Sequence, residues 1–167
     1  MMFRLLIVML LAIAALPAHA AGASGMFGSG RTQFSLTAGN AYAFEKRYSV
    51  IGGSVSYYLA EGLGVGLSLA RWSGEGPVIT KYAPFVQYAF LPISGVRPYI
   101  GGFYRHTDID GLPGLKSAGA RGGVLMASGR NAYLGIGVVY EAYLDCQPSV
   151  YRVCRETYPD FNLSFGF

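Results

Sequence analysis

Residues Phe161–Phe167, F-N-L-S-F-G-F, alternate large apolar side chains with small or polar ones without a break. Alternation with a period of two predicts a β-strand with one apolar and one polar face. The pattern recurs upstream, most regularly over residues 63–70, L-G-V-G-L-S-L-A. The chain is therefore expected to be all-β.

Turns rich in glycine, proline and charged residues divide the chain into eight such strands. Ten residues tilted by about 40° rise about 25 Å, the height of a membrane barrel's apolar band. We therefore predict an eight-stranded antiparallel up-and-down transmembrane β-barrel over residues 31–167. An even number of strands places both chain ends on the periplasmic side, with tight turns at 60–62 and 128–131 on that side and longer loops near residues 45, 75, 111 and 150 outside. The expected strands lie near residues 33–38, 51–59, 63–70, 79–90, 97–107, 116–127, 132–143 and 158–167.

The beginning of the chain is typical of a cleaved secretory signal. Arg4 precedes the apolar run Leu5–Leu16, and Ala18-His19-Ala20 matches a signal-peptidase site. We expect residues 1–20 to be removed and residues 21–30, rich in small side chains, to form a flexible leader. Without Arg4 the charge is 12 Lys/Arg minus 9 Asp/Glu, or +3, which is too mild to suggest a nucleic-acid partner.

Composition favours a membrane barrel over a soluble one. The chain is 52% hydrophobic and 13% charged, against a usual ~25% charged in soluble domains, yet no stretch after residue 20 is long enough for a membrane helix. A soluble lipocalin-type barrel would place the large apolar row inside a lumen only just wide enough for side chains. We therefore expect that row to face lipid. Aromatic residues near strand ends are expected to form the interface girdles, namely Tyr42, Phe44, Tyr48, Tyr57, Tyr82, Tyr88, Phe90, Tyr99, Tyr143 and Tyr158.

Cys146 and Cys154 are the chain's two cysteines. In an oxidising compartment so close a pair favours one disulfide, and a metal site would need further ligands that the neighbourhood lacks. The bond would pin the outer loop near residue 150.

Three segments carry a family resemblance: Pro84–Tyr88, Arg97–Gly102 and the terminal Phe167. They resemble the small outer-membrane β-barrel superfamily, which includes OmpW-like and OmpX-like proteins and the OmpA transmembrane domain. The resemblance implies a bacterial outer-membrane location. It also implies that the barrel-assembly machinery reads the last strand through Phe161, Leu163, Phe165 and Phe167.

The lipid A 3-O-deacylases share this scaffold and carry a His-x-Ser motif late in the barrel. The corresponding segment here, Val138–Ala142, has neither residue. His106, followed by Asp108 and Asp110, belongs either to a metal site or general base or simply to a solvated loop. No positioned serine accompanies it, which favours the solvated loop. We expect no enzyme activity, no cofactor and no metal.

Two groups of charged residues have functional interpretations. Glu141, Arg121 and Arg105 are expected to face the lumen, where they form either a salt-bridge network that plugs the barrel or a gate for ions. The second group, expected at the outer rim, either contacts lipopolysaccharide phosphates or is simply solvated; it comprises Arg47, Arg71, Lys81, Arg105, Lys116, Arg152 and Arg155.

The function expected from the sequence is therefore a structural or interaction role in the outer membrane, with a basic rim against lipopolysaccharide. A narrow passive channel for small hydrophobic molecules is the alternative, by analogy with OmpW-like barrels. A lipid A-modifying enzyme comes third. The oligomeric state is left open.

Overall fold

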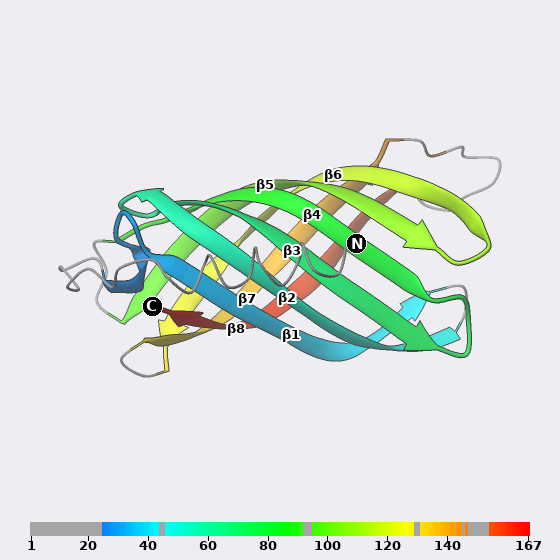
Figure 1. The fold of residues 1–167 in the computed structure, drawn as a ribbon, viewed down its shortest axis with the longest axis horizontal. Coiled ribbons are helices and arrows are strands. Elements are labelled where there is room, and N and C mark those ends of the chain that lie inside the picture. The colour runs from blue at the N-terminus through cyan, green and yellow to red at the C-terminus, as the bar shows by residue number, and fades with distance from the viewer. Residues whose placement is uncertain (1–24, 44–45, 92–94, 129–130, 145, 147–153) are drawn as a thin grey trace, which may run out of the picture.

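A computed structural model describes residues 25–43, 46–91, 95–128, 131–144, 146 and 154–167. Eight antiparallel strands follow one another around a closed barrel in chain order (Figure 1). No helix within these ranges is long and apolar enough to cross a bilayer. The elements are η1 Gly25–Phe27, β1 Thr32–Ala43, β2 Lys46–Ala60, β3 Leu63–Gly74, β4 Ile79–Ala89, β5 Val96–Ile109, β6 Leu112–Ala127, β7 Ala132–Tyr143 and β8 Arg155–Gly166.

The large apolar side chains lie on the outside of the barrel, as the alternation predicted. Leu67 on β3 is 58% exposed and Ile100 on β5 is 57% exposed, whereas the inward-facing Gln87 and Ser164 are 7% and 0% exposed. The closed ladder pairs backbone groups between neighbouring strands, which is what a bilayer requires of a spanning sheet. The fold is that of a transmembrane barrel with an apolar outer face and a polar lumen.

The barrel has two distinct ends. Gly25–Phe27 and Phe167 lie together at one of them, called here the terminal end, with the strand ends that flank residues 61–62, 90–95 and 128–131. The other, called the loop end, has the connections 44–45, 75–78, 110–111 and 144–154.

The connection near residue 111 is shorter than expected. A loop over residues 108–115 was predicted, but β5 runs to Ile109 and β6 begins at Leu112. Gly111 takes a φ of 78°, a left-handed conformation that glycine adopts without strain, so a two-residue turn suffices. The N–H of Asp110 donates to the carbonyl of Val78 at 3.0 Å and ties this hairpin to its neighbour. The prediction of a long loop here was wrong.

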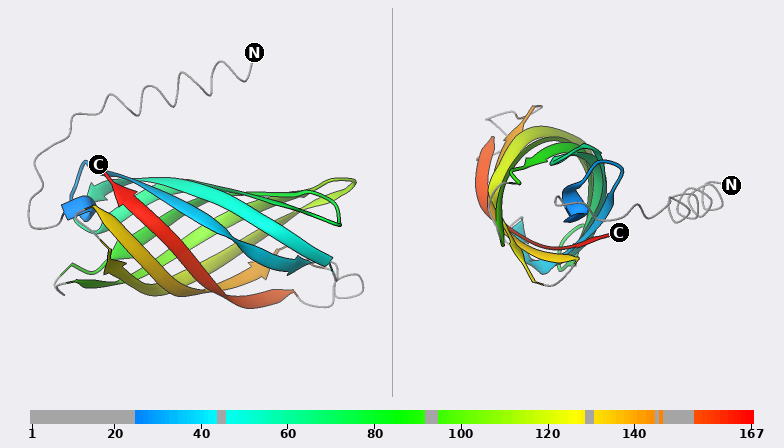
Figure 2. Two further views of the ribbon diagram at one scale, coloured as in Figure 1. Left: turned by 90° about the horizontal axis from the view of Figure 1, so that it is seen from below. Right: turned by 90° about the vertical axis from the view of Figure 1, so that its left-hand side faces the viewer.

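The described part of the leader is packed, not loose. Residues 25–27 form a short 3-10 turn in the terminal mouth of the barrel (Figure 2). Phe27 is 0% exposed, and its carbonyl accepts a hydrogen bond from the N–H of Gly62 at 2.8 Å. Because residues 1–24 lie outside the described ranges, the signal-peptide prediction for residues 1–20 stays a prediction.

The barrel closes through a short seam. β1 and β8 share four residue pairs, from Gln33↔Gly166 to Leu36↔Leu163, whereas every other neighbouring pair of strands shares nine to thirteen. Beyond Leu36 the two strands diverge toward the loop end (Figure 2). The wall is therefore least continuous between its first and last strands.

Candidate functional site

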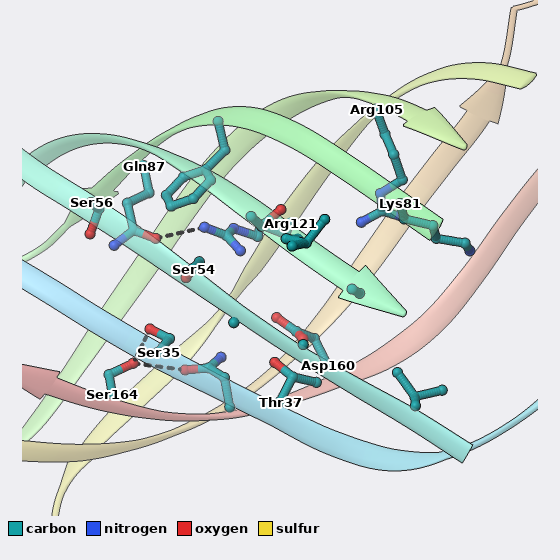
Figure 3. A pocket seen from close by; sticks show the side chains of 18 of the residues that line it. Ser35, Thr37, Ser54, Ser56, Lys81, Gln87, Arg105, Arg121, Asp160 and Ser164 are labelled. Atoms are coloured by element: carbon teal, nitrogen blue, oxygen red, sulfur yellow. Dashed lines mark hydrogen bonds between the residues drawn. The ribbon is translucent and has the colours of Figure 1, made fainter. Parts of the chain in front are cut away.

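The inward row of small and polar residues encloses a chamber of about 180 Å³ in the middle of the barrel (Figure 3). Inward glycines make room for the larger luminal side chains: Gly66 lies against Phe85 and Gly119 against Phe103. The polar part of the lining is Gln33, Ser35, Thr37, Ser54, Ser56, Ser68, Lys81, Gln87, Tyr99, Arg105, Arg121, Tyr158, Asp160, Asn162 and Ser164.

Apolar clusters lie at both ends of this chamber. At the terminal end, Phe27 packs edge-to-face on Tyr58 and Tyr133, with ring centroids 5.6 and 5.0 Å apart, and Arg97 lies over the Phe27 ring at 4.8 Å. At the loop end, Tyr48, Ile79 and Ile109 form a second buried cluster. These side chains narrow the lumen on either side of the chamber.

Glu141 is the centre of the luminal ion pair. Its side chain is 0% exposed, and its carboxylate accepts hydrogen bonds from Arg105 at 2.5 Å, Ser117 at 2.5 Å and Tyr158 at 2.7 Å. Tyr158 also accepts from Arg105 at 2.7 Å. A buried carboxylate so surrounded has its charge neutralised and its lone pairs occupied, so this cluster stiffens the barrel wall.

Arg121 belongs to a separate network. It faces the lumen as expected, but its Nη2 donates to Gln87 Oε1 at 2.8 Å and not to Glu141. Gln87 in turn donates to the Tyr58 hydroxyl at 2.9 Å, and that hydroxyl donates to Gln33 at 2.5 Å. The guanidinium also lies 4.4 Å from the centre of the Phe85 ring. The three charged residues expected to form one luminal network are thus divided between two.

Lys81 faces the lumen, so its assignment to the rim was wrong. It has the inward parity of β4, which it shares with Phe85 and Gln87, and its Nζ lies 3.9 Å from the centre of the Trp72 ring. Arg105 was expected both in the lumen and at the rim, and it lies in the lumen, paired with Glu141. Strand parity, which the sequence already displays, places both residues inside.

The remaining rim candidates divide into outward-facing and undescribed residues. Arg152 lies outside the described residues. The others are exposed on the outer face near the loop end: Arg47 on β2, Arg71 on β3, Lys116 on β6 and Arg155 on β8.

His106 lies on β5 and faces outward. Its ring stacks on Tyr82, with centroids 5.6 Å apart, and its Nε2 lies 2.9 Å from Asp108 Oδ1. The Tyr82 hydroxyl donates to the other oxygen of the Asp108 carboxylate. No group of three or more potential metal ligands occurs in the part of the chain that the structure describes.

The expected aromatic girdles are only partly correct. Tyr57, Tyr82, Tyr88 and Phe90 are exposed on the outside, but Tyr48 and Tyr99 are buried in the lumen, at 1% and 5% exposure. Whether a ring lies on the outer face or in the lumen again depends on the parity of its residue along the strand. Phe44 and the Tyr42 side chain lie outside what is described.

The disulfide and the last strand match their predictions in geometry. Cys146 and Cys154 are bonded, with Cα atoms 5.5 Å apart. On β8, Phe161 and Leu163 lie on the outer face at 57% and 37% exposure, and Phe165 shares their parity. The N–H of Phe167 donates to the Thr32 carbonyl at 3.0 Å, which joins the chain's last residue to its first strand.

Comparison with known proteins agrees with this architecture. No protein-family model matches the chain, and no curated protein matches it. Among solved structures, it is similar to the N-terminal β-barrel domain of Pseudomonas aeruginosa OprF, at TM-score 0.63 and 20% identity over 84% of this chain and 99% of that one. It is also similar to Neisserial surface protein A, at TM-score 0.55 and 16% identity over 82% and 96%. At these identities the likeness establishes the fold of small outer-membrane barrels.

Proposed function

We propose that this chain is a non-enzymatic bacterial outer-membrane protein whose basic rim contacts lipopolysaccharide. The terminal end is then periplasmic and the loop end extracellular. The observation that carries the proposal is the set of outward cations on β2, β3, β6 and β8 where the apolar wall ends. Phosphate groups of the outer leaflet lie at that height and attract exposed Lys and Arg side chains.

One part of the rim supports this proposal. Lys116 is the ladder partner of His106 on β5, and Arg71 is the partner of Thr80 on β4. The stacked Tyr82 and His106 rings lie between these two cations on the outer face. Aromatic rings beside cations are typical of a membrane interface, where the rings meet the headgroup boundary and the cations meet phosphate.

The proposal is tested by titrating the purified barrel in detergent with lipopolysaccharide. Each cation near an anionic surface contributes about 1 kcal/mol, so the variant Arg71→Gln/Lys116→Gln is expected to bind roughly 30-fold more weakly. Lys81→Gln is the matched control, because it removes the same charge from inside the lumen. Equal affinity in the rim variant and the wild type, or an equal loss in the control, contradicts the proposal.

The structure favours this function over the axial channel. A conduit through the barrel needs a continuous passage, and Phe27, Tyr58 and Tyr133 occupy the terminal mouth. Tyr48 and Ile79 occupy the opposite end of the lumen.

A further inference from the structure

The seam between β1 and β8 is open at membrane depth. Its ladder ends at Leu36↔Leu163, although β1 continues to Ala43 and β8 begins at Arg155. Extending the register would pair Ala38 with Phe161. The β2 partner of Ala38 is Ile51, 70% exposed, and the β7 partner of Phe161 is Ile136, 39% exposed. The opening therefore begins within the apolar band.

A proline helps to keep the seam open. Phe167 donates its N–H to Thr32 on β1, and backbone groups along a strand alternate between its two neighbours. Odd-numbered residues of β8, including Pro159, therefore direct their backbone groups toward β1. Extending the register would place Pro159 opposite Asn40, where its missing N–H removes a ladder hydrogen bond.

Hydrocarbon cannot satisfy the backbone groups along these open edges. Non-helical backbone at membrane depth is tolerated where it lines a polar cavity or is covered by protein. The chamber lies directly behind the opening, because Thr37 on β1 and Asp160 and Asn162 on β8 belong to its lining (Figure 3). The seam thus joins a polar chamber to an apolar exterior.

The chamber holds a donor that lacks an acceptor. Arg121 Nε is buried and has no hydrogen-bond partner among the described residues. The charged residues of the lining are Lys81, Arg105, Arg121 and Asp160. Since Glu141 neutralises Arg105, two cations face one carboxylate, which leaves one positive charge in excess. A small anionic group would compensate this excess positive charge.

We propose that the β1–β8 seam is a lateral binding site for a single-chain anionic amphiphile such as a long-chain fatty acid. Its carboxylate enters the chamber and accepts a hydrogen bond from Arg121. Its acyl chain stays outside, against Leu36 and Phe161, which are 61% and 57% exposed. The apolar clusters narrow both ends of the lumen, which favours entry of the ligand through the side of the barrel.

The chain's single tryptophan reports on this site, because Trp72 lines the chamber. Stearic acid with a nitroxide at carbon 5, near the carboxylate, is titrated into the purified protein in lipid nanodiscs. We expect saturable quenching of Trp72 fluorescence, stronger than that by the 16-nitroxide isomer. Arg121→Gln should weaken the apparent affinity about tenfold, as the loss of a charged hydrogen bond predicts.

Pro159→Val tests the seam itself. Valine restores the missing N–H and lets the ladder extend, so binding should fall and the amides of residues 38–42 should exchange more slowly with deuterium. Pro98→Val is the matched control, since Pro98 lies on β5, a strand paired along both sides.

A disulfide across the seam is a second way to close it. In Ala38→Cys/Phe161→Cys, oxidation should abolish the saturable quenching and reduction should restore it.

The proposal is overturned if quenching rises without saturation in the wild type, as simple partitioning into lipid produces. It is equally overturned if Arg121→Gln and the oxidised double-cysteine variant bind as the wild type does. The rim variant Arg71→Gln/Lys116→Gln should keep its amphiphile binding, so this site and the lipopolysaccharide contact can fail separately.

Discussion

At the scale of single residues, Glu141 is a buried charge whose partners can be tested one at a time. It is fully buried and bonded to Arg105, Ser117 and Tyr158. Glu141→Leu leaves Arg105, whose side chain is 18% exposed, without its counter-charge, and the loss should approach the roughly 3–5 kcal/mol of a fully buried pair. We expect that loss in the free energy of unfolding, measured in urea with detergent by the gel-mobility shift between folded and unfolded barrel.

The double variant Arg105→Met/Glu141→Leu separates charge from packing. Removing both partners should recover most of the stability, because no buried charge is left unpaired. Arg155→Gln, on the outer face, should change stability by less than about 0.5 kcal/mol. A double variant as unstable as Glu141→Leu alone would mean that packing at this position, and not charge compensation, is what matters.

Whether a side chain faces lipid or the lumen follows from strand parity, which can be read from the sequence. The exposed positions of Leu67, Ile100 and Val138 were predictable because lipid selects large apolar side chains at every second residue. Lys81 and Tyr48 were misplaced because residue type was allowed to outweigh parity. The partners of Arg121 were not predictable, since they depend on how β4, β2 and β1 are brought together across the lumen.

At the scale of elements, η1 is the part least evident from the sequence. Its glycine-rich surroundings suggest flexibility, and nothing local indicates that Phe27 packs between Tyr58 and Tyr133. Phe27→Ala removes a fully buried ring and should cost about 3–5 kcal/mol. Phe90→Ala, a ring 44% exposed on the lipid face, should cost clearly less in the same urea titration. Equal losses would indicate that Phe27 is not part of the core.

The disulfide constrains one loop, whereas the barrel wall is held by the hydrogen bonds between its strands. Cys146 and Cys154 close a loop of nine residues, for which chain entropy gives about 2.6 kcal/mol. Cys146→Ser/Cys154→Ser should lower the free energy of unfolding by no more than this amount, while the strand amides of β7 keep their protection in hydrogen exchange. Loss of that protection would show that the bond holds the wall as well.

The extent of the strands was also only partly predictable. Turn residues mark where a strand can end, but paired neighbours decide where it does end. Gly111 allows a two-residue turn, so β5 and β6 both extend into the segment Asp108–Leu115, which resembles a loop by composition. The short ladder between β1 and β8 is invisible in the sequence apart from Pro159.

For the whole molecule, the obstructed lumen predicts no steady conductance. Purified protein in planar bilayers should show no unitary current steps, because apolar clusters occupy the axis at both ends. Phe27→Ala is the informative variant, since it removes one obstruction and leaves the other. Regular steps from the wild-type protein would support the axial channel instead.

The fold was predictable as a whole because one physical demand acts on every strand. A bilayer requires apolar side chains outside and paired backbone throughout, so the same alternation is repeated around the barrel. The luminal charges leave no comparable repeated signal, because each is a single unusual residue in that alternation, as Arg121 and Asp160 are.

The most direct test of the orientation is a nitroxide scan along residues 64–70 of β3 in liposomes. Each residue is replaced by cysteine and spin-labelled, and its collision rate with oxygen, which concentrates in lipid, is compared with that of a water-soluble nickel complex. Oxygen accessibility should peak at Val65, Leu67 and Leu69 and fall at the residues between them. Peaks at Gly64, Gly66 and Ser68, or no alternation at all, would contradict the apolar-side-out barrel.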